Sequence, residues 1–67
     1  MTVARTTEIV AGSAKSFEAA FEVGVKRACK TLDQVTGAWI QDQEAIIKDG
    51  KIKEYRVRMK VTFVLKS

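Results

Sequence analysis

The second half of the chain alternates between apolar and polar residues on both sides of Asp49-Gly50. Asp-Gly between two such runs is a strong hairpin signal, because both central residues of a type I′ turn need a positive φ. The pattern therefore predicts one long β-hairpin over Thr36–Lys66. A two-residue turn also sets the register, so Ile40 is expected opposite Met59, with the same spacing along both arms.

The strand period of two predicts two different faces for this hairpin. One face is apolar and must be covered, and it carries Ala38, Ile40, Tyr55, Val57, Met59, Val61, Phe63 and Leu65. The other face is polar and basic, and the register sets Gly37, Trp39, Gln41 and Gln43 opposite Thr62, Lys60, Arg58 and Arg56. Asp42 and Glu44 are expected opposite Val57 and Tyr55. The basic face is free to meet water, a partner or a ligand.

The first half of the chain predicts a strand followed by a helix. Val3–Val10 alternates weakly and is typical of a short strand, which Ala11-Gly12-Ser13 is expected to end. Apolar residues then recur with the helical period from Phe17 to about Leu32, and Ser16 is the best N-cap candidate. The apolar stripe contains small residues that would let the helix approach a sheet closely, namely Ala20, Gly24 and Ala28.

This order predicts a single α+β domain over residues 1–67, with β-α-β-β topology and one helix on one face of a three-stranded antiparallel sheet. The helix would be about 24 Å long at 1.5 Å per residue, whereas the hairpin arms would run roughly 40 Å. The helix therefore leaves the tip uncovered, where Ile46, Ile47 and Ile52 lie. Self-association would cover both the tip and the second sheet face. The alternative is a small monomer with a tolerated apolar tip.

Composition narrows the class of protein. The chain has 67 residues, 46% of them hydrophobic, and no proline, which is typical of one ordered domain. Cys29 is the single cysteine, so no internal disulfide is possible. Since the sequence has neither a long apolar run nor a signal-peptide pattern, a cytoplasmic protein without a membrane partner is expected. The net charge of +4 fits either a solvated mixed surface or attraction to phosphate through Arg56, Arg58 and Lys60.

The sequence contains no sign of catalytic chemistry. It has no histidine and no phosphate-cradling glycine loop, and Cys29 has no base to activate it, so an enzyme is not expected. Asp42, Glu44 and Asp49 would bind a cation only if symmetry brought copies together, so no metal site is expected within one chain. Nucleic acid is not expected as a partner either. Arg56, Arg58, Lys60 and Lys66 could attract its phosphates, but the sheet face carries one aromatic residue where an RNA-binding sheet usually presents two or three. That aromatic, Trp39, either stacks a planar ligand or packs in a subunit interface.

An ordered set of segments spanning nearly the whole chain resembles the dodecins, a family of small β-α-β-β proteins of bacteria and archaea. The segments are Ala11-Gly12-Ser13, Ser16-Phe17-Glu18-Ala19-Ala20, Lys30-Thr31-Leu32, Asp49-Gly50-Lys51 and the run from Tyr55 to Phe63. The resemblance implies a hollow homododecamer with the helices outside and the sheets lining the interior. It also implies binding and storage of riboflavin or FMN between symmetry-related tryptophans, without flavoenzyme activity.

The resemblance also shows an altered site. The tryptophan and the glutamine that contact the flavin in relatives fall on Gly37 and Arg56 here. Trp39 lies two residues further along the same face, about 6.5 Å away, where it either takes over the stacking or only fills the volume. Asp42 and Gln43 match a region near the ligand. The candidate ligand-binding residues are Gly37, Trp39, Asp42, Gln43, Arg56 and Arg58.

Two hypotheses about the ligand follow. Arg56, Arg58 and Lys60 facing a lumen would favour a phosphate-bearing ligand, such as FMN or coenzyme A, over neutral riboflavin. The alternative is a structural shell that sequesters ions or nucleotides and does not bind flavin.

Overall fold

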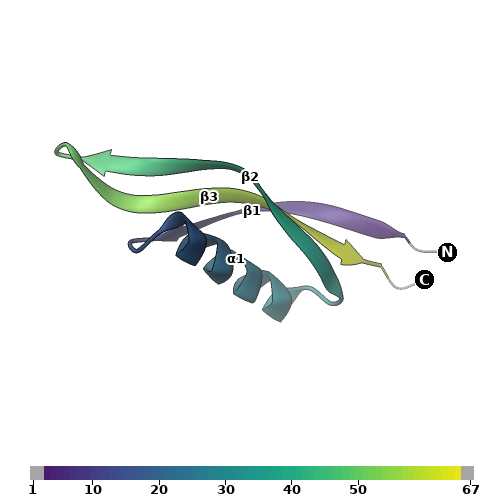
Figure 1. Cartoon of the computed structure of the whole chain (residues 1–67). Helices are drawn as coiled ribbons and strands as arrows, with labels where there is room; N and C mark the ends of the chain where they lie inside the picture. The colour runs from purple at the N-terminus through teal and green to yellow at the C-terminus, as the bar shows by residue number, and fades with distance from the viewer. Residues whose placement is uncertain (1–2, 66–67) are drawn as a thin grey trace.

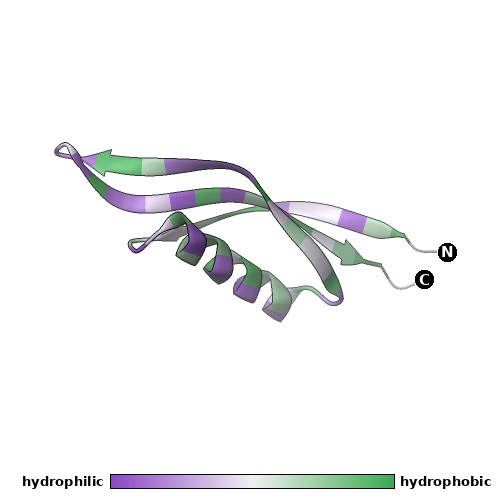
Figure 2. Ribbon diagram, in the orientation of Figure 1, coloured by the Kyte–Doolittle hydropathy of each residue, from purple (hydrophilic) through white to green (hydrophobic). Residues whose placement is uncertain are grey.

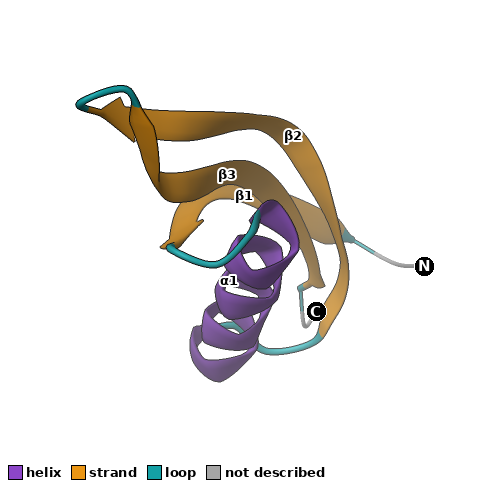
Figure 3. Ribbon diagram, turned by 60° about the vertical axis from the view of Figure 1, so that its left-hand side comes forward, coloured by secondary structure: helices purple, strands orange, loops and turns teal. Residues whose placement is uncertain are grey.

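The computed structural model describes residues 3–65 and consists of one helix and one three-stranded sheet. Along the chain the elements are β1 (Ala4–Ser13), α1 (Phe17–Thr31), β2 (Val35–Lys48) and β3 (Lys51–Val64). The sheet is antiparallel with the order β1-β3-β2, and α1 lies against one of its faces (Figures 1 and 3). The predicted α+β fold with β-α-β-β topology is confirmed. Lys66, which was included in the predicted hairpin, lies outside the described residues.

The predicted hairpin turn is present at Asp49-Gly50. Both residues have a positive φ, 53° at Asp49 and 74° at Gly50, as a type I′ turn requires. Each arm contains 14 residues, and the molecule measures 51 Å along its longest axis against 18 and 13 Å along the others. The tip of the hairpin therefore projects well beyond the start of α1 (Figure 1).

The first strand is longer than its alternation predicts. Instead of ending at Val10, β1 continues to Ser13, with Gly12 opposite Arg56 on β3. The prediction was wrong because β3 offers partners for the backbone N–H and C=O groups of this segment, which local propensity does not reveal. Gly12 also suits the site sterically, since a Cβ there would lie 2.6 Å from Oε2 of Glu54.

The helix begins where the sequence predicts. Ser16 has an extended backbone, and its side-chain oxygen accepts a hydrogen bond from the N–H of Ala19 at 3.0 Å. This contact satisfies one of the free N–H groups of the first turn. The helix ends at Thr31, and the N–H of Leu32 donates to the Ala28 carbonyl at 2.8 Å.

The core lies between α1 and the central strand β3. Met59 is fully buried there, together with Val57, Val61 and the small helix residues Ala20 and Ala28. Partly buried residues surround this centre, namely Ile9, Phe17, Phe21, Val25, Leu32, Val35 and Ala38. The predicted apolar face is therefore covered over β1 and β3, but less completely over β2, where Ile40 stays 42% exposed.

The register of the hairpin agrees with the prediction only near its base and its turn. Ile40 lies opposite Met59 as expected, but a β-bulge follows and shifts the pairing by one residue. Asp42 consequently faces Arg58, and Glu44 faces Arg56, instead of Val57 and Tyr55. Another irregularity between Ile46 and Ile47 restores the original register before the turn, and a third lies at the base of the hairpin between Val35 and Gly37. Long twisted arms commonly contain such bulges, which a period of two cannot predict.

The hairpin tip is apolar and uncovered. Ile47 lies directly opposite Ile52, and the two residues are 59% and 51% exposed. Figure 2 shows this hydrophobic end of β2 in green, beyond the reach of α1. The prediction that the helix is too short to cover the tip is confirmed.

Candidate ligand-binding face

The side of the sheet opposite α1 has no covering element among the described residues, and we call it the uncovered face (Figure 3). Because directly paired residues share a side of the sheet, the register defines its members. They include Ala4, Thr6, Glu8, Val10 and Gly12 on β1, Glu54, Arg56, Arg58, Lys60, Thr62 and Val64 on β3, and Gly37, Trp39, Asp42, Glu44 and Ile46 on β2.

Trp39 is the large aromatic residue of the uncovered face. It lies directly opposite Lys60, whose neighbour on the other side is Glu8 of β1. The Trp39 side chain is 47% exposed, which is unusual for so large an apolar group. An indole half buried in a sheet and half free presents one surface on which a planar ligand can stack.

Open space adjoins this indole at Gly37. Gly37 lies opposite Thr62, one pair along the same face from Trp39 and Lys60. A Cβ added at Gly37 would meet no atom within 4 Å. The backbone here therefore leaves room for a side chain or for part of a ligand.

Arg58 on the central strand β3 forms ion pairs with residues of both neighbouring strands. Its Nε lies 3.4 Å from Oε2 of Glu8 on β1, and its Nη1 lies 3.6 Å from Oδ2 of Asp42 on β2. All three side chains are about half exposed, so water screens these pairs and each stabilises the fold only slightly. The main effect of these pairs is on the local charge, because the carboxylates of Glu8 and Asp42 together offset the positive charge of Arg58.

Arg56 also takes part in an ion pair, but with a residue of its own strand. Its Nε donates to Oε1 of Glu54 at 2.9 Å, and Glu44 lies directly opposite on β2. The uncovered face consequently combines the cations Arg56, Arg58 and Lys60 with the carboxylates Glu8, Asp42, Glu44 and Glu54. The prediction of a basic face is therefore wrong. The bulge in β2 brings in Asp42 and Glu44, and the pairing of β1 brings in Glu8, neither of which the alternation predicts. Glu54 shares the face of Arg56 through the alternation of β3 itself.

The structure brings together most of the predicted site. Gly37, Trp39, Asp42, Arg56 and Arg58 all lie on the uncovered face. Gln43 does not, because after the bulge it faces the buried Val57 on the helix side of the sheet. Sequence reasoning missed Glu8, whose role depends on the pairing of β1 with β3. The alternation along β1 indicates which face of the sheet carries Glu8. It does not indicate that Arg58 is its partner.

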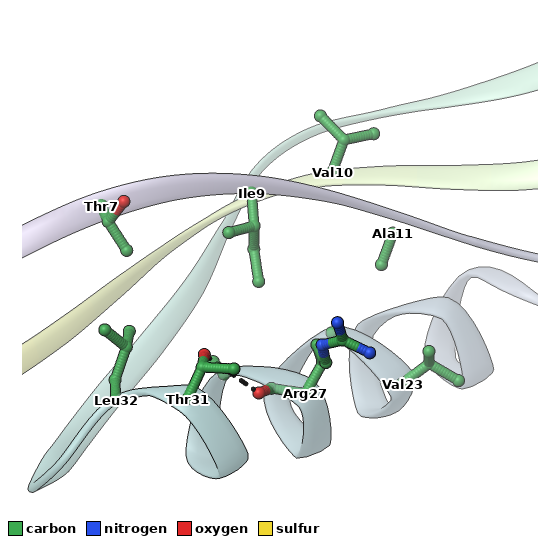
Figure 4. Close-up of a pocket in the computed structure, with 10 residues that line it drawn as sticks. Thr7, Ile9, Val10, Ala11, Val23, Arg27, Thr31 and Leu32 are labelled. Carbon is green, nitrogen blue, oxygen red and sulfur yellow. Dashed lines mark hydrogen bonds between the residues drawn. The ribbon is translucent and has the colours of Figure 1, made fainter.

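A second concave feature, the edge groove, lies between β1 and α1 and has a volume of about 450 Å³. Figure 4 shows Ile9 and Ala11 pointing from β1 towards the helix, while Val10 points to the other side. The groove is lined by Thr7, Ile9, Val10, Ala11, Val23, Gly24, Arg27, Ala28, Thr31 and Leu32. It is mainly apolar and lies at an open edge of the sheet, away from Trp39.

Within residues 3–65, no three or more His, Cys, Asp or Glu side chains are grouped so that they could hold a metal ion. The described helix is also too short and too polar to cross a membrane.

These features define a small α+β protein with one helix-covered sheet face and one open face that carries a half-exposed tryptophan. The family model described as Dodecin matches residues 3–66. The chain therefore belongs to the dodecin family. No curated protein sequence matches the chain.

Solved structures support the same assignment. The chain is similar to a mutant of the dodecin from Thermus thermophilus, with a TM-score of 0.92 and 30% identity over 100% of both chains. It is similar to dodecin from Streptomyces davaonensis, with a TM-score of 0.92 and 30% identity over 98% of this chain and 97% of that one. A calcium dodecin from Mycobacterium tuberculosis, described as having a novel calcium-binding site, gives a TM-score of 0.84 and 25% identity over 96% and 91%. A homododecameric assembly is consistent with these relatives.

Proposed function

We propose that this dodecin is a homododecameric binding and storage protein, without enzymatic activity, that holds a flavin on its uncovered face. The observation that carries the proposal is the half-exposed Trp39, which lies beside the open space at Gly37. In this arrangement Trp39 supplies the stacking surface that the tryptophan at the position of Gly37 supplies in flavin-binding relatives.

The distribution of apolar surface supports an assembly of many copies. The tip pair Ile47 and Ile52, the edge groove and Trp39 are three separate apolar surfaces on an elongated chain. A monomer of this size has few ways to cover them, whereas a closed symmetric assembly covers several at once. If the uncovered faces point inward, each ligand is also shielded from bulk solvent.

The energetics of stacking support a planar ligand. A base or ring stacked on an aromatic side chain contributes about 1–3 kcal/mol. Two tryptophans related by symmetry would each make such a contact. This contribution requires access to a face of each ring, and the 47% exposure of Trp39 in the single chain leaves surface available for stacking.

A titration of riboflavin and FMN against the native oligomer tests this proposal. The flavin fluorescence is followed after the mass of the assembly has been confirmed on the same sample. Strong quenching that saturates near one flavin per chain is expected. Trp39→Leu should weaken the binding tenfold or more, whereas Trp39→Phe should retain part of it. A protein of the correct mass that quenches neither flavin would contradict flavin storage.

Gly37→Trp complements Trp39→Leu, because it adds an aromatic residue to the site instead of removing one. Because a Cβ at this position meets no neighbouring atom of the chain within 4 Å, the variant is expected to fold, and the mass of its assembly is measured before the titration. The variant places a tryptophan where flavin-binding relatives have one. If this variant binds flavin and the unchanged protein does not, Trp39 fails to replace the missing aromatic residue, while the rest of the face still accepts the ligand.

A second candidate is a shell that holds ions or nucleotides and no flavin. It is favoured by Gly37 and Arg56 at the positions of the flavin contacts, and by the calcium binding that is described for the relative from Mycobacterium tuberculosis. The emission of Trp39 distinguishes the two functions, since a maximum that neither flavin shifts or quenches supports the second. Calorimetric titration with calcium and with ATP would then identify which class of ligand is held.

A further inference from the structure

The charges of the uncovered face are divided along its length. Towards the hairpin tip, Arg58 lies between two carboxylates, and Arg56 is paired with Glu54 and faces Glu44. Any anion that approached either arginine would also approach these carboxylates. The half of the face nearer the tip is therefore poorly suited to a phosphate group.

Lys60 differs from both arginines. It takes part in no ion pair with another described residue, although it lies opposite Glu8, whose carboxylate is directed to Arg58. Its partner on the other side is Trp39. A ligand stacked on the indole would consequently have the ammonium group of Lys60 beside it.

The surroundings of Lys60 on the side away from the tip are neutral and can donate hydrogen bonds. The next pair along β3 places Thr62 between Thr6 of β1 and Gly37 of β2. The two hydroxyl groups can donate to phosphate oxygens, and the missing side chain at Gly37 leaves space next to them. Cation, hydroxyl donors and open space thus occur together only at this end of the described face.

We propose that Lys60, together with Thr62 and the space at Gly37, forms the anion-binding part of the site and takes the phosphate of a planar ligand stacked on Trp39. The inference rests on the proposed function and names the residue that decides between phosphate-bearing and neutral ligands. It assigns that role to Lys60, and neither Arg56 nor Arg58 provides it.

Charged and neutral quenchers of the Trp39 fluorescence test the anion site without any flavin. Trp39 is the only tryptophan of the chain, so its signal is unambiguous. Iodide should quench it more strongly, relative to neutral acrylamide, than it quenches free tryptophan. Lys60→Met should lower the ratio of iodide to acrylamide quenching by about two- to fivefold, and Lys60→Arg should preserve it.

Lys53→Met is the matched control, because it also removes one positive charge from an exposed position of β3 that lies outside the candidate site. Lys53 lies seven residues from Lys60, or about 23 Å along an extended strand, which exceeds the Debye length of about 8 Å at 0.15 M salt. The quenching ratio should therefore stay unchanged. The same variants are then titrated with FMN and riboflavin, and only Lys60→Met should abolish a preference for FMN.

The outcomes separate the two proposals. If iodide quenching depends on Lys60 but neither flavin binds, the anion site stands and flavin storage fails. If iodide quenching is insensitive to Lys60, or if acrylamide cannot reach Trp39 in the assembled protein, the anion site is overturned whatever the flavins do. Equal binding of FMN and riboflavin by the unchanged protein would also overturn it.

Discussion

Gly24 of α1 and Met59 of β3 approach each other so closely that no side chain fits between them. A Cβ at Gly24 would lie 2.5 Å from the Met59 sulfur and 3.2 Å from the Cβ of Ala11. Met59 is fully buried, so moving its side chain to admit a Cβ would disturb the packing of its neighbours. This contact sets the distance between the helix and the sheet.

Gly24→Val is expected to destabilise the protein by about 1–3 kcal/mol or more through overpacking. Gly37→Val is the control, because a side chain there meets no atom within 4 Å and valine suits a strand. The free energy of unfolding, measured by denaturant titration at equal protomer concentration, should fall only for Gly24→Val. Equal stability of both variants would mean that the helix can move away from Met59 at little cost.

Ser16→Ala is expected to cost about 1 kcal/mol, the usual contribution of an N-cap. The variant removes the oxygen that accepts the Ala19 N–H at 3.0 Å. Ser16→Asp should retain most of the stability, since a carboxylate caps the helix and interacts favourably with its dipole. Thermal unfolding of the three proteins checks this, and a loss of stability in Ser16→Asp as large as in Ser16→Ala would argue against capping as the cause.

Gly50→Val is expected to destabilise the hairpin by about 1–2 kcal/mol, because Gly50 has a φ of 74° and a side chain is strained in that region. Lys51→Val, at the adjacent strand position, changes a residue without this constraint and serves as the comparison. Hydrogen exchange of the amides near the tip should rise in Gly50→Val alone. Unchanged exchange in that variant would show that the arms hold the register without help from the turn.

Replacement of both Ile47 and Ile52 by threonine is expected to weaken the assembly while leaving the fold of the chain intact. Both side chains are more than half exposed and lie outside the core, so their contribution depends on other copies. Burial of an isoleucine in an interface contributes on the order of 1.5–3 kcal/mol. The mass distribution at several dilutions, measured by light scattering, should shift to smaller species.

Replacement of Lys48 and Lys51 by threonine provides the control for this experiment, since these two residues form the neighbouring pair at the tip. The control should assemble as the unchanged protein does. If the isoleucine variant also keeps its full mass on dilution, the tip is not part of an interface.

Local patterns were sufficient for the helix and the hairpin turn of this protein, but not for the length of β1. The residue types at Asp49-Gly50 determine the turn, because few other pairs tolerate two positive φ values. Ser16 and the small residues of the stripe determine where α1 begins and which side it buries. The mismatch in length between helix and hairpin follows from the number of residues in each, and it correctly predicted the exposure of Ile47 and Ile52.

Tertiary pairing decided the composition of the candidate site. A bulge after Ile40 turns Asp42 and Glu44 to the uncovered face and Gln43 away from it. Nothing in a period of two marks the position of a bulge, because a bulge bends and twists its strand to fit the shape of the whole sheet. The pairing of β1 with β3 likewise brings Glu8 to Arg58, a contact between residues that are distant in the sequence.

The sequence by itself therefore predicted correctly that Trp39 would lie opposite Lys60. The pair keeps the register set by the turn because the two irregularities between it and the turn offset each other. Only the tertiary structure decided which cations near it remain available. Arg58 is offset by carboxylates that another strand and a shifted register bring to it. Arg56 pairs with Glu54 of its own strand and faces Glu44 through the same shift, whereas Lys60 takes part in no such pair with a described residue. The reason is physical: side-chain alternation is a local property of a strand, but charge neutralisation depends on distances across the sheet.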